Sequence, residues 1–136
     1  MATRSVSAFD VTGWDQTRYE EEAAGPVLSR VTIRKSYHGD LAGESTAELL
    51  MCQADPSDLS SGAGYVASER VVGHLGGREG TFVMQHWGIS GSGVQRTSGH
   101  VIPGSGTGEL AGLSGDVEIA VDANGGHKVT LTYDLE

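Results

Sequence analysis

The chain has 136 residues and a formal net charge of −9, from 9 Lys and Arg against 18 Asp and Glu. This length fits one domain, predicted to span residues 1–136. The charge disfavours nucleic acids and anionic membrane surfaces as partners, because both are bound through clustered Lys and Arg. Apolar residues make up 38% of the chain, enough for one core, so wholesale disorder is disfavoured.

The expected location is the cytoplasm. Cys52 is the only cysteine, so no disulfide can form within the chain, which fits a reducing compartment. The first seven residues contain no apolar segment typical of a signal peptide. Strongly apolar stretches such as Leu49-Leu50-Met51 are far shorter than the roughly 18 residues of a membrane helix.

Short β-favouring runs follow one another from the N-terminus. The first is Ser5–Trp14, and the acidic segment Asp15–Pro26 after it is predicted to be a loop. The next run, Val27–His38, alternates apolar and polar residues as a half-buried strand does. Its predicted apolar face carries Val27, Val31, Ile33 and Tyr37.

The segment Gly43–Gln53 is compatible with two structures. Ser45-Thr46-Ala47-Glu48 matches a helix capping box, and the residues after it favour a helix. As a strand, the same segment would place Glu44, Thr46, Glu48, Leu50 and Cys52 on one face. We prefer the strand, because both neighbouring segments are predicted strands.

The second half of the chain continues the pattern of short strands and tight turns. Asn124-Gly125 is the strongest hairpin signal in the chain. With no convincing long helix, the pattern predicts an all-β fold, an antiparallel barrel or sandwich of about eight strands. The predicted strands of this half are Tyr65–Leu75, Thr81–Ile89, Val94–Ile102, Val117–Val121 and Val129–Leu135.

Several segments resemble, in order and spacing, a bacterial family of small proteins of unknown function with an allene-oxide-cyclase-like barrel. The resemblance implies a closed antiparallel β-barrel with a central cavity, and a homo-oligomer. The related plant cyclases and the dirigent proteins steer cyclisation or coupling of apolar intermediates, which is an analogy at the level of the fold. The resemblance is carried by Gly104–Gly115, Gly43–Glu48, Glu69-Arg70 with Gly73, and Gly80-Thr81-Phe82 leading to Gln85-His86.

No motif announces a cofactor or a metal, and we predict neither. Gly106-x-Gly108-x-x-Ala111 formally matches a dinucleotide fingerprint, but no βαβ unit surrounds it. The sequence contains no P-loop and no G-x-S-x-G nucleophile elbow. Its five histidines form no metal-binding spacing.

Polar residues inside apolar strands are the candidate catalytic groups. Neighbours in a strand point to opposite faces, so one member of Glu69-Arg70 and one of Gln85-His86 should point into the barrel. Glu48 or Glu69 with His86 is therefore our candidate acid–base pair. The competing interpretation is a buried hydrogen-bonded network that only fixes the barrel.

A second group of residues is predicted to bind a ligand. Tyr65, Phe82 and Trp87 lie in the central strands and could line a pocket, with Arg70 and Gln85 beside them. The alternative is that the aromatic residues are ordinary core filling.

Three functions remain open from the sequence. The first is a barrel that binds a small apolar molecule and, if it is an enzyme, acts as a cofactor-independent isomerase or cyclase. The second is a non-catalytic homo-oligomeric binding or assembly module, because Met84 and Trp87 lie on opposite faces of one strand. The third is an acid hydrolase with paired carboxylates, although no Asp-Thr/Ser-Gly triplet marks one.

Overall fold

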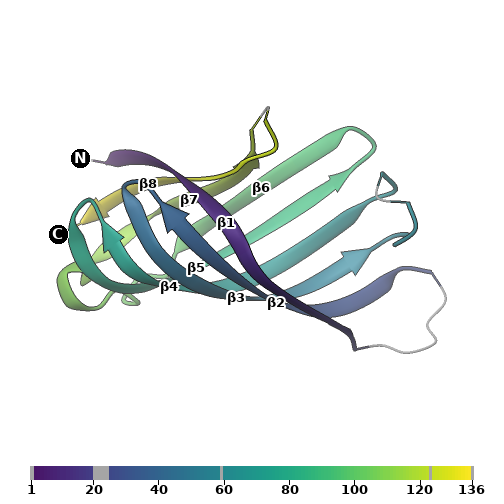
Figure 1. Cartoon of the computed structure of the whole chain (residues 1–136), viewed down its shortest axis with the longest axis horizontal. Helices are drawn as coiled ribbons and strands as arrows, with labels where there is room; N and C mark the ends of the chain where they lie inside the picture. The colour runs from purple at the N-terminus through teal and green to yellow at the C-terminus, as the bar shows by residue number, and fades with distance from the viewer. Residues whose placement is uncertain (1, 20–24, 59, 123, 136) are drawn as a thin grey trace.

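The computed structural model describes residues 2–19, 25–58, 60–122 and 124–135. Its strands form one antiparallel sheet that closes into a ring, the last strand pairing with the first (Figure 1). The only helical element in these ranges is the 3₁₀ turn η1 (Gly108–Leu110). The eight strands are β1 (Thr3–Arg18), β2 (Val27–His38), β3 (Leu41–Gln53), β4 (Ala63–Leu75), β5 (Arg78–Gly91), β6 (Val94–Val101), β7 (Leu113–Val121) and β8 (His127–Leu135).

The predicted all-β fold and the strand form of Gly43–Gln53 are confirmed, since this segment lies within β3 and pairs with β2 and β4 along its length. The predicted loop Asp15–Pro26 is wrong at its start. Asp15 to Arg18 continue β1, because they pair with Thr32 to Ser29 of β2. The Glu20–Glu22 part of that loop lies outside the described residues. No helix in the described ranges is long and apolar enough to span a membrane.

The two ends of the ring differ in how they are built. At one end, called here the terminal end, lie both chain termini and the turns from β2 to β3 and from β4 to β5 (Figure 1). At the other, called the hairpin end, lie the last residues of β1, β3 and β5 and the first residues of β2, β4 and β6. Strands β1 to β5 have 12 to 16 residues, whereas β6 to β8 have only 8 or 9.

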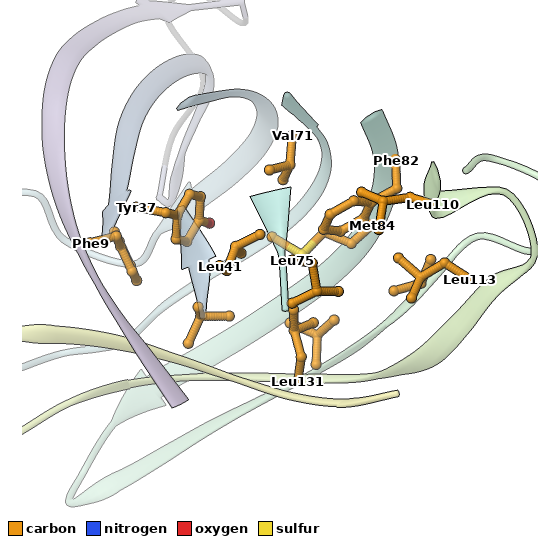
Figure 2. Close-up of a cluster of buried hydrophobic side chains, with 13 residues drawn as sticks. Phe9, Tyr37, Leu41, Val71, Leu75, Phe82, Met84, Leu110, Leu113 and Leu131 are labelled. Atoms are coloured by element: carbon orange, nitrogen blue, oxygen red, sulfur yellow. The ribbon is translucent and has the colours of Figure 1, made fainter. Parts of the chain in front are cut away.

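The main hydrophobic core fills the terminal end. Figure 2 shows its side chains pointing toward one another from several strands, with Leu110 of η1 among them. Burial of large apolar side chains is the main stabilising contribution here. The buried members are Phe9, Tyr37, Leu41, Val71, Leu75, Phe82, Met84, Val101, Leu110, Leu113, Val117, Val129 and Leu131.

A smaller apolar cluster lies toward the hairpin end. Its buried members are Val31, Ile33, Ala47, Leu49 and Ala67. Only two residue pairs join β6 to β7, compared with thirteen between β3 and β4. The ring is therefore least tightly closed between β6 and β7, where a side chain, the Thr97 hydroxyl, bonds the backbone N–H and C=O of Ile119.

Candidate functional site

A buried carboxylate lies inside the ring between the two apolar clusters. Glu69 of β4 is fully buried, and its register partners Ala47 and Met84 are buried core residues. The next residue of the strand, Arg70, points to the opposite face and is exposed. Strand alternation thus forces Glu69 into the interior once Arg70 faces water.

Four side chains satisfy this carboxylate. Lys35 Nζ and His86 Nε2 lie 2.9 and 2.8 Å from Oε1. The hydroxyls of Ser45 and Tyr37 donate to Oε2, at 2.6 and 2.5 Å. A buried charge is tolerated only when it is paired and hydrogen-bonded in this way.

The network keeps Glu69 ionised. Burial alone would raise the pKa of this carboxyl group, but the hydrogen bond with His86 and the positive charge of Lys35 oppose that effect. Together with the donors Ser45 and Tyr37, they lower the pKa of Glu69 to about 2. Burial and the negative charge of Glu69 in turn raise the pKa of Tyr37 well above its usual value, so Tyr37 keeps its proton.

His86 connects the carboxylate to a residue nearer the hairpin end. It is 4% exposed, and its Nδ1 lies 2.9 Å from the Tyr65 hydroxyl. An ionised carboxylate only accepts hydrogen bonds, so Nε2 of His86 carries the hydrogen shared with Glu69. In the neutral imidazole, Nδ1 then accepts the hydrogen bond of Tyr65. Burial and the charge of Glu69 raise the pKa of Tyr65 to about 12, so Tyr65 is a neutral phenol near pH 7.

A hollow of about 130 Å³, called here the rim hollow, opens at the hairpin end beside Tyr65. Tyr65 is half-buried and is the only member of the hydrogen-bonded group that lines it. A second hollow of about 350 Å³ shares this wall and extends over the outer face of β3 to β5. Residues that line both are Met51, Gly64, Tyr65, Gly88 and Ile89.

Two glycines make room for this arrangement. A Cβ on Gly88 would lie 2.6 Å from Cε2 of Tyr65, so the Tyr65 ring occupies the space that a side chain would fill. A Cβ on Gly99 would lie 2.5 Å from Cβ of His86, which explains how β6 passes so close to this histidine. Both glycines therefore act through close packing rather than through turn geometry.

The structure brings together some of the predicted site residues. Of the predicted acid–base candidates, Glu69 and His86 are in direct contact, and the predicted ligand-binding residue Tyr65 joins them. Phe82 is buried in the main core and does not join this group.

The remaining predicted residues face outward and do not join the buried group. Glu48 accepts a hydrogen bond from Thr32 on the outer face, so it is not a partner of His86. Strand alternation explains this, because Glu48 has the opposite orientation to the inward-facing Ala47 and Leu49. Arg70, Gln85 and Trp87 also face outward. Gln85 donates a hydrogen bond to Ser68, and the Trp87 ring lies beneath the guanidinium of Arg96.

An outer groove of about 390 Å³ is lined by some of these outward residues. In its centre Leu50, Val66 and Trp87 are direct cross-strand neighbours on β3, β4 and β5. Each is exposed, by 49%, 57% and 37% respectively. The groove is therefore a feature of the outer face in which an apolar row is flanked by polar residues such as Glu48 and Gln85.

Sequence analysis missed Lys35, Ser45 and Tyr37 as partners of the carboxylate. A signal for Lys35 was present in the sequence. Lys35 lies two residues from Ile33 and from Tyr37, so it points to the same face of the strand Val27–His38 as these apolar residues. A lysine on an apolar face needs a buried anion, and Glu69 is the only buried carboxylate among the described residues. Ser45 has no comparable signal in the sequence.

The described part of the chain offers no evident metal centre. No group of three or more His, Cys, Asp or Glu is placed to hold an ion there. The buried carboxylate is instead surrounded by two nitrogen donors and two hydroxyl donors. What the arrangement can do is accept, hold and pass on a proton along Tyr65, His86 and Glu69.

Comparison with known proteins identifies similar chains. The pattern of the family described as "protein of unknown function (DUF3224)" matches residues 5–133. A crystal structure of a DUF3224 protein of unknown function from Shewanella oneidensis MR-1 is similar, with 36% identity and a TM-score of 0.85. The alignment covers 100% of this chain and 99% of that one. No curated protein matches the sequence.

Proposed function

The chain belongs to the DUF3224 family, and from its geometry we propose that it binds a small apolar molecule at the hairpin end and isomerises or cyclises it by proton transfer. The observation that carries the proposal is the chain of hydrogen bonds from Tyr65 through His86 to Glu69. It begins at a residue that lines a hollow and ends at a buried anion. The resemblance to allene-oxide-cyclase-like barrels supports the same reaction class, and remains part of the proposal.

The proposed step needs no co-reactant. As the Tyr65 oxygen takes a proton from the substrate, its own proton passes to Nδ1 of His86, and the resulting imidazolium is stabilised by the carboxylate of Glu69. The reverse transfer delivers a proton to another atom of the substrate. An isomerisation or ring closure of this kind leaves the protein in its starting protonation state.

Lys35, Ser45 and Tyr37 have a positioning role in this proposal. They hold the carboxylate of Glu69 in one geometry, and Lys35 also balances its charge. Only Tyr65 would touch the substrate, which is the reason for testing the hydroxyl of Tyr65 rather than the carboxylate of Glu69.

Native mass spectrometry of gently purified protein is the first test, because it reports retained molecules directly. We expect an adduct of a few hundred daltons. The second test is conversion of 3-cyclohexen-1-one to its conjugated isomer, a model proton transfer within a small ketone. We expect Tyr65→Phe and His86→Gln to slow it by about 100-fold or more while circular dichroism stays unchanged. A bare protein with no turnover of the ketone would contradict the proposal.

A second candidate function is assembly into a homo-oligomer through the outer face. The observation that favours it is the exposed apolar row of Leu50, Val66 and Trp87, which a second copy of the same sheet face would cover. Analytical ultracentrifugation should then show a dimer that Val66→Glu dissociates. Val72→Glu is the matched control, since Val72 is equally exposed on the same strand but lies outside the row. A monomer at all concentrations would contradict it.

A further inference from the structure

The second half of β1 is an open edge of the sheet at the hairpin end. Pairing with β8 ends at Phe9, and from there the two strands diverge (Figure 1). Among the described residues, Gly13 to Arg18 pair with β2 alone. Open edges of sheets are commonly protected by proline, lysine or a covering segment. This stretch contains neither proline nor lysine, and each residue from Trp14 to Arg18 is exposed.

Three residues of this edge direct backbone groups away from β2. In an antiparallel pair, residues whose N–H and C=O both bond to the neighbouring strand alternate with residues whose groups point the other way. The N–H of Tyr19 bonds to the C=O of Leu28 in β2, which sets this alternation. The N–H and C=O groups of Trp14, Gln16 and Arg18 therefore point to the open edge. In the part of the chain that the structure describes, they have no backbone partner.

The side chains of this edge favour pairing with a second copy of itself. Two copies related by a two-fold axis pair antiparallel with one residue opposite its own copy, so that opposite residues share a face. Asp15 opposite Asp15 would place two carboxylates together, and Arg18 opposite Arg18 two guanidiniums, which is unfavourable in both cases. Gln16 opposite Gln16 avoids both. It also places the unused backbone groups of one copy opposite those of the other.

A contact between an aromatic ring and a cation selects this register further. With Gln16 on the axis, Trp14 lies opposite Arg18 of the second copy, and the pair occurs twice by symmetry. Both residues face the inner side of the sheet, because their register partners in β2 are the buried Ile33 and Ser29. The Trp14 ring is 51% exposed, so a guanidinium can stack on it as a cation–π pair. Moving the axis by one residue in either direction would lose this pair.

We infer that the chain forms a homodimer through this edge, with Trp14 to Arg18 of the two copies paired antiparallel and Gln16 on the two-fold axis. The pairing uses every one of the unused backbone groups, with two hydrogen bonds at each opposite residue pair. It joins two rings into one continuous sheet at the hairpin end. The inference does not rest on the proposed function, and this edge is separate from the exposed apolar row on β3, β4 and β5.

Cysteine cross-linking tests the register, in a Cys52→Ser background that removes the native thiol. We expect Gln16→Cys to form a disulfide dimer on mild oxidation, because the Cα atoms of such a pair lie about 5.5 Å apart. Asp15→Cys and Thr17→Cys are the matched controls, since in this register each lies opposite the other residue and not its own copy. Non-reducing electrophoresis should show at least about tenfold less dimer for them. Stronger cross-linking through either control would overturn the inference.

Analytical ultracentrifugation of Gln16→Pro and Gln16→Ala measures the contribution of the edge backbone. Both variants lose the side chain, but only proline loses the N–H. That N–H points away from β2, so the ring keeps its own backbone hydrogen bonds. We expect Gln16→Pro to raise the dimer dissociation constant by at least about tenfold, and Gln16→Ala by about threefold or less. Circular dichroism should show the same fold in both.

Three results would overturn the inference. The first is a monomer at all concentrations, and the second is a dimer that the two variants at Gln16 weaken equally. The third is a dimer that Val66→Glu dissociates and Gln16→Pro leaves intact, which would assign dimerisation to the outer face. A dimer that Gln16→Pro dissociates and Val66→Glu leaves intact supports the inference.

Discussion

The terminal end of the ring has a packed interior, whereas the hairpin end, built from the same long strands, is open. At the terminal end large side chains such as Leu41, Leu75 and Phe82 fill the interior, and η1 adds Leu110 to them. At the hairpin end the long strands β1 to β5 continue past the short β7 and β8. Trp14 shows the consequence, because its register partner Ile33 faces inward, yet Trp14 is 51% exposed.

The different strand lengths thus give the ring one packed end, which stabilises the fold, and one end that is open to solvent. Where the inner face is covered on all sides it is packed, and where the opposing strands end it is open to solvent and ligands. The polar group around Glu69 lies between the two regions and is reached from the open one through Tyr65. The comparison predicts large effects for substitutions in the closed end and polar layer, and small effects at the open rim.

The largest effect is expected from Glu69→Gln. It removes the buried negative charge while leaving Lys35 and His86 in place, so the free energy of unfolding should fall by about 3–5 kcal/mol. Urea unfolding followed by circular dichroism measures it. Glu48→Gln is the control, a carboxylate on the adjacent strand that faces water, with an expected change of about 0.5 kcal/mol or less. Similar losses in both variants would show that the polar layer is not a special region.

A smaller difference is expected between the two apolar regions themselves. Leu75→Ala, in the closed end, should lower the free energy of unfolding by about 3 kcal/mol, because the fully buried side chain leaves a cavity. Met51→Ala, at the partly buried rim, should lower it by about 1 kcal/mol, since solvent already reaches the side chain. Chemical unfolding of the two variants gives both values, and equal losses would contradict the division into a closed and an open end.

Sequence analysis could predict the ring and half of the polar layer. Strand alternation was enough to place Glu69 opposite Arg70 and His86 opposite Gln85, because the two faces of a strand are fixed by geometry. It could not say which face was inward for Glu48. That choice depends on which face of β3 packs against the core, which is decided by contacts with strands distant in the sequence.

The register across the ring was the part that the sequence could not supply. The contact between Lys35 and Glu69 joins residues 34 positions apart, and no local pattern specifies that pairing. The extension of β1 to Arg18 was missed for a related reason. Asp15 at its start has a low strand preference, and pairing with β2 overrides that preference.

Acid should weaken the polar layer over a defined pH range. The folded-state pKa of Glu69, about 2, lies below the ordinary value of 4.5, so the folded protein binds fewer protons than the unfolded chain between these values. The stabilisation is complete above pH 4.5 and is lost as pH falls toward 2. Between pH 6 and pH 3 this group alone should lower the free energy of unfolding by about 2 kcal/mol. The ¹³C shift of the Glu69 carboxyl carbon tests the assignment, and a titration midpoint near 4.5 would contradict it.

The smallest effect is expected at the open rim, from Gly88→Ala. The added Cβ would lie 2.6 Å from the Tyr65 ring, so the ring must move, at a cost of about 1 kcal/mol. The Tyr65 hydroxyl should then lose its hydrogen bond to His86, seen as a changed His86 Nδ1 chemical shift with the core signals unchanged. Gly64→Ala is the control on the neighbouring strand, because its Cβ would meet no atom closer than 3.4 Å. If both variants leave the His86 signal unchanged, packing at Gly88 does not position Tyr65. The open rim and the polar layer would then be structurally independent.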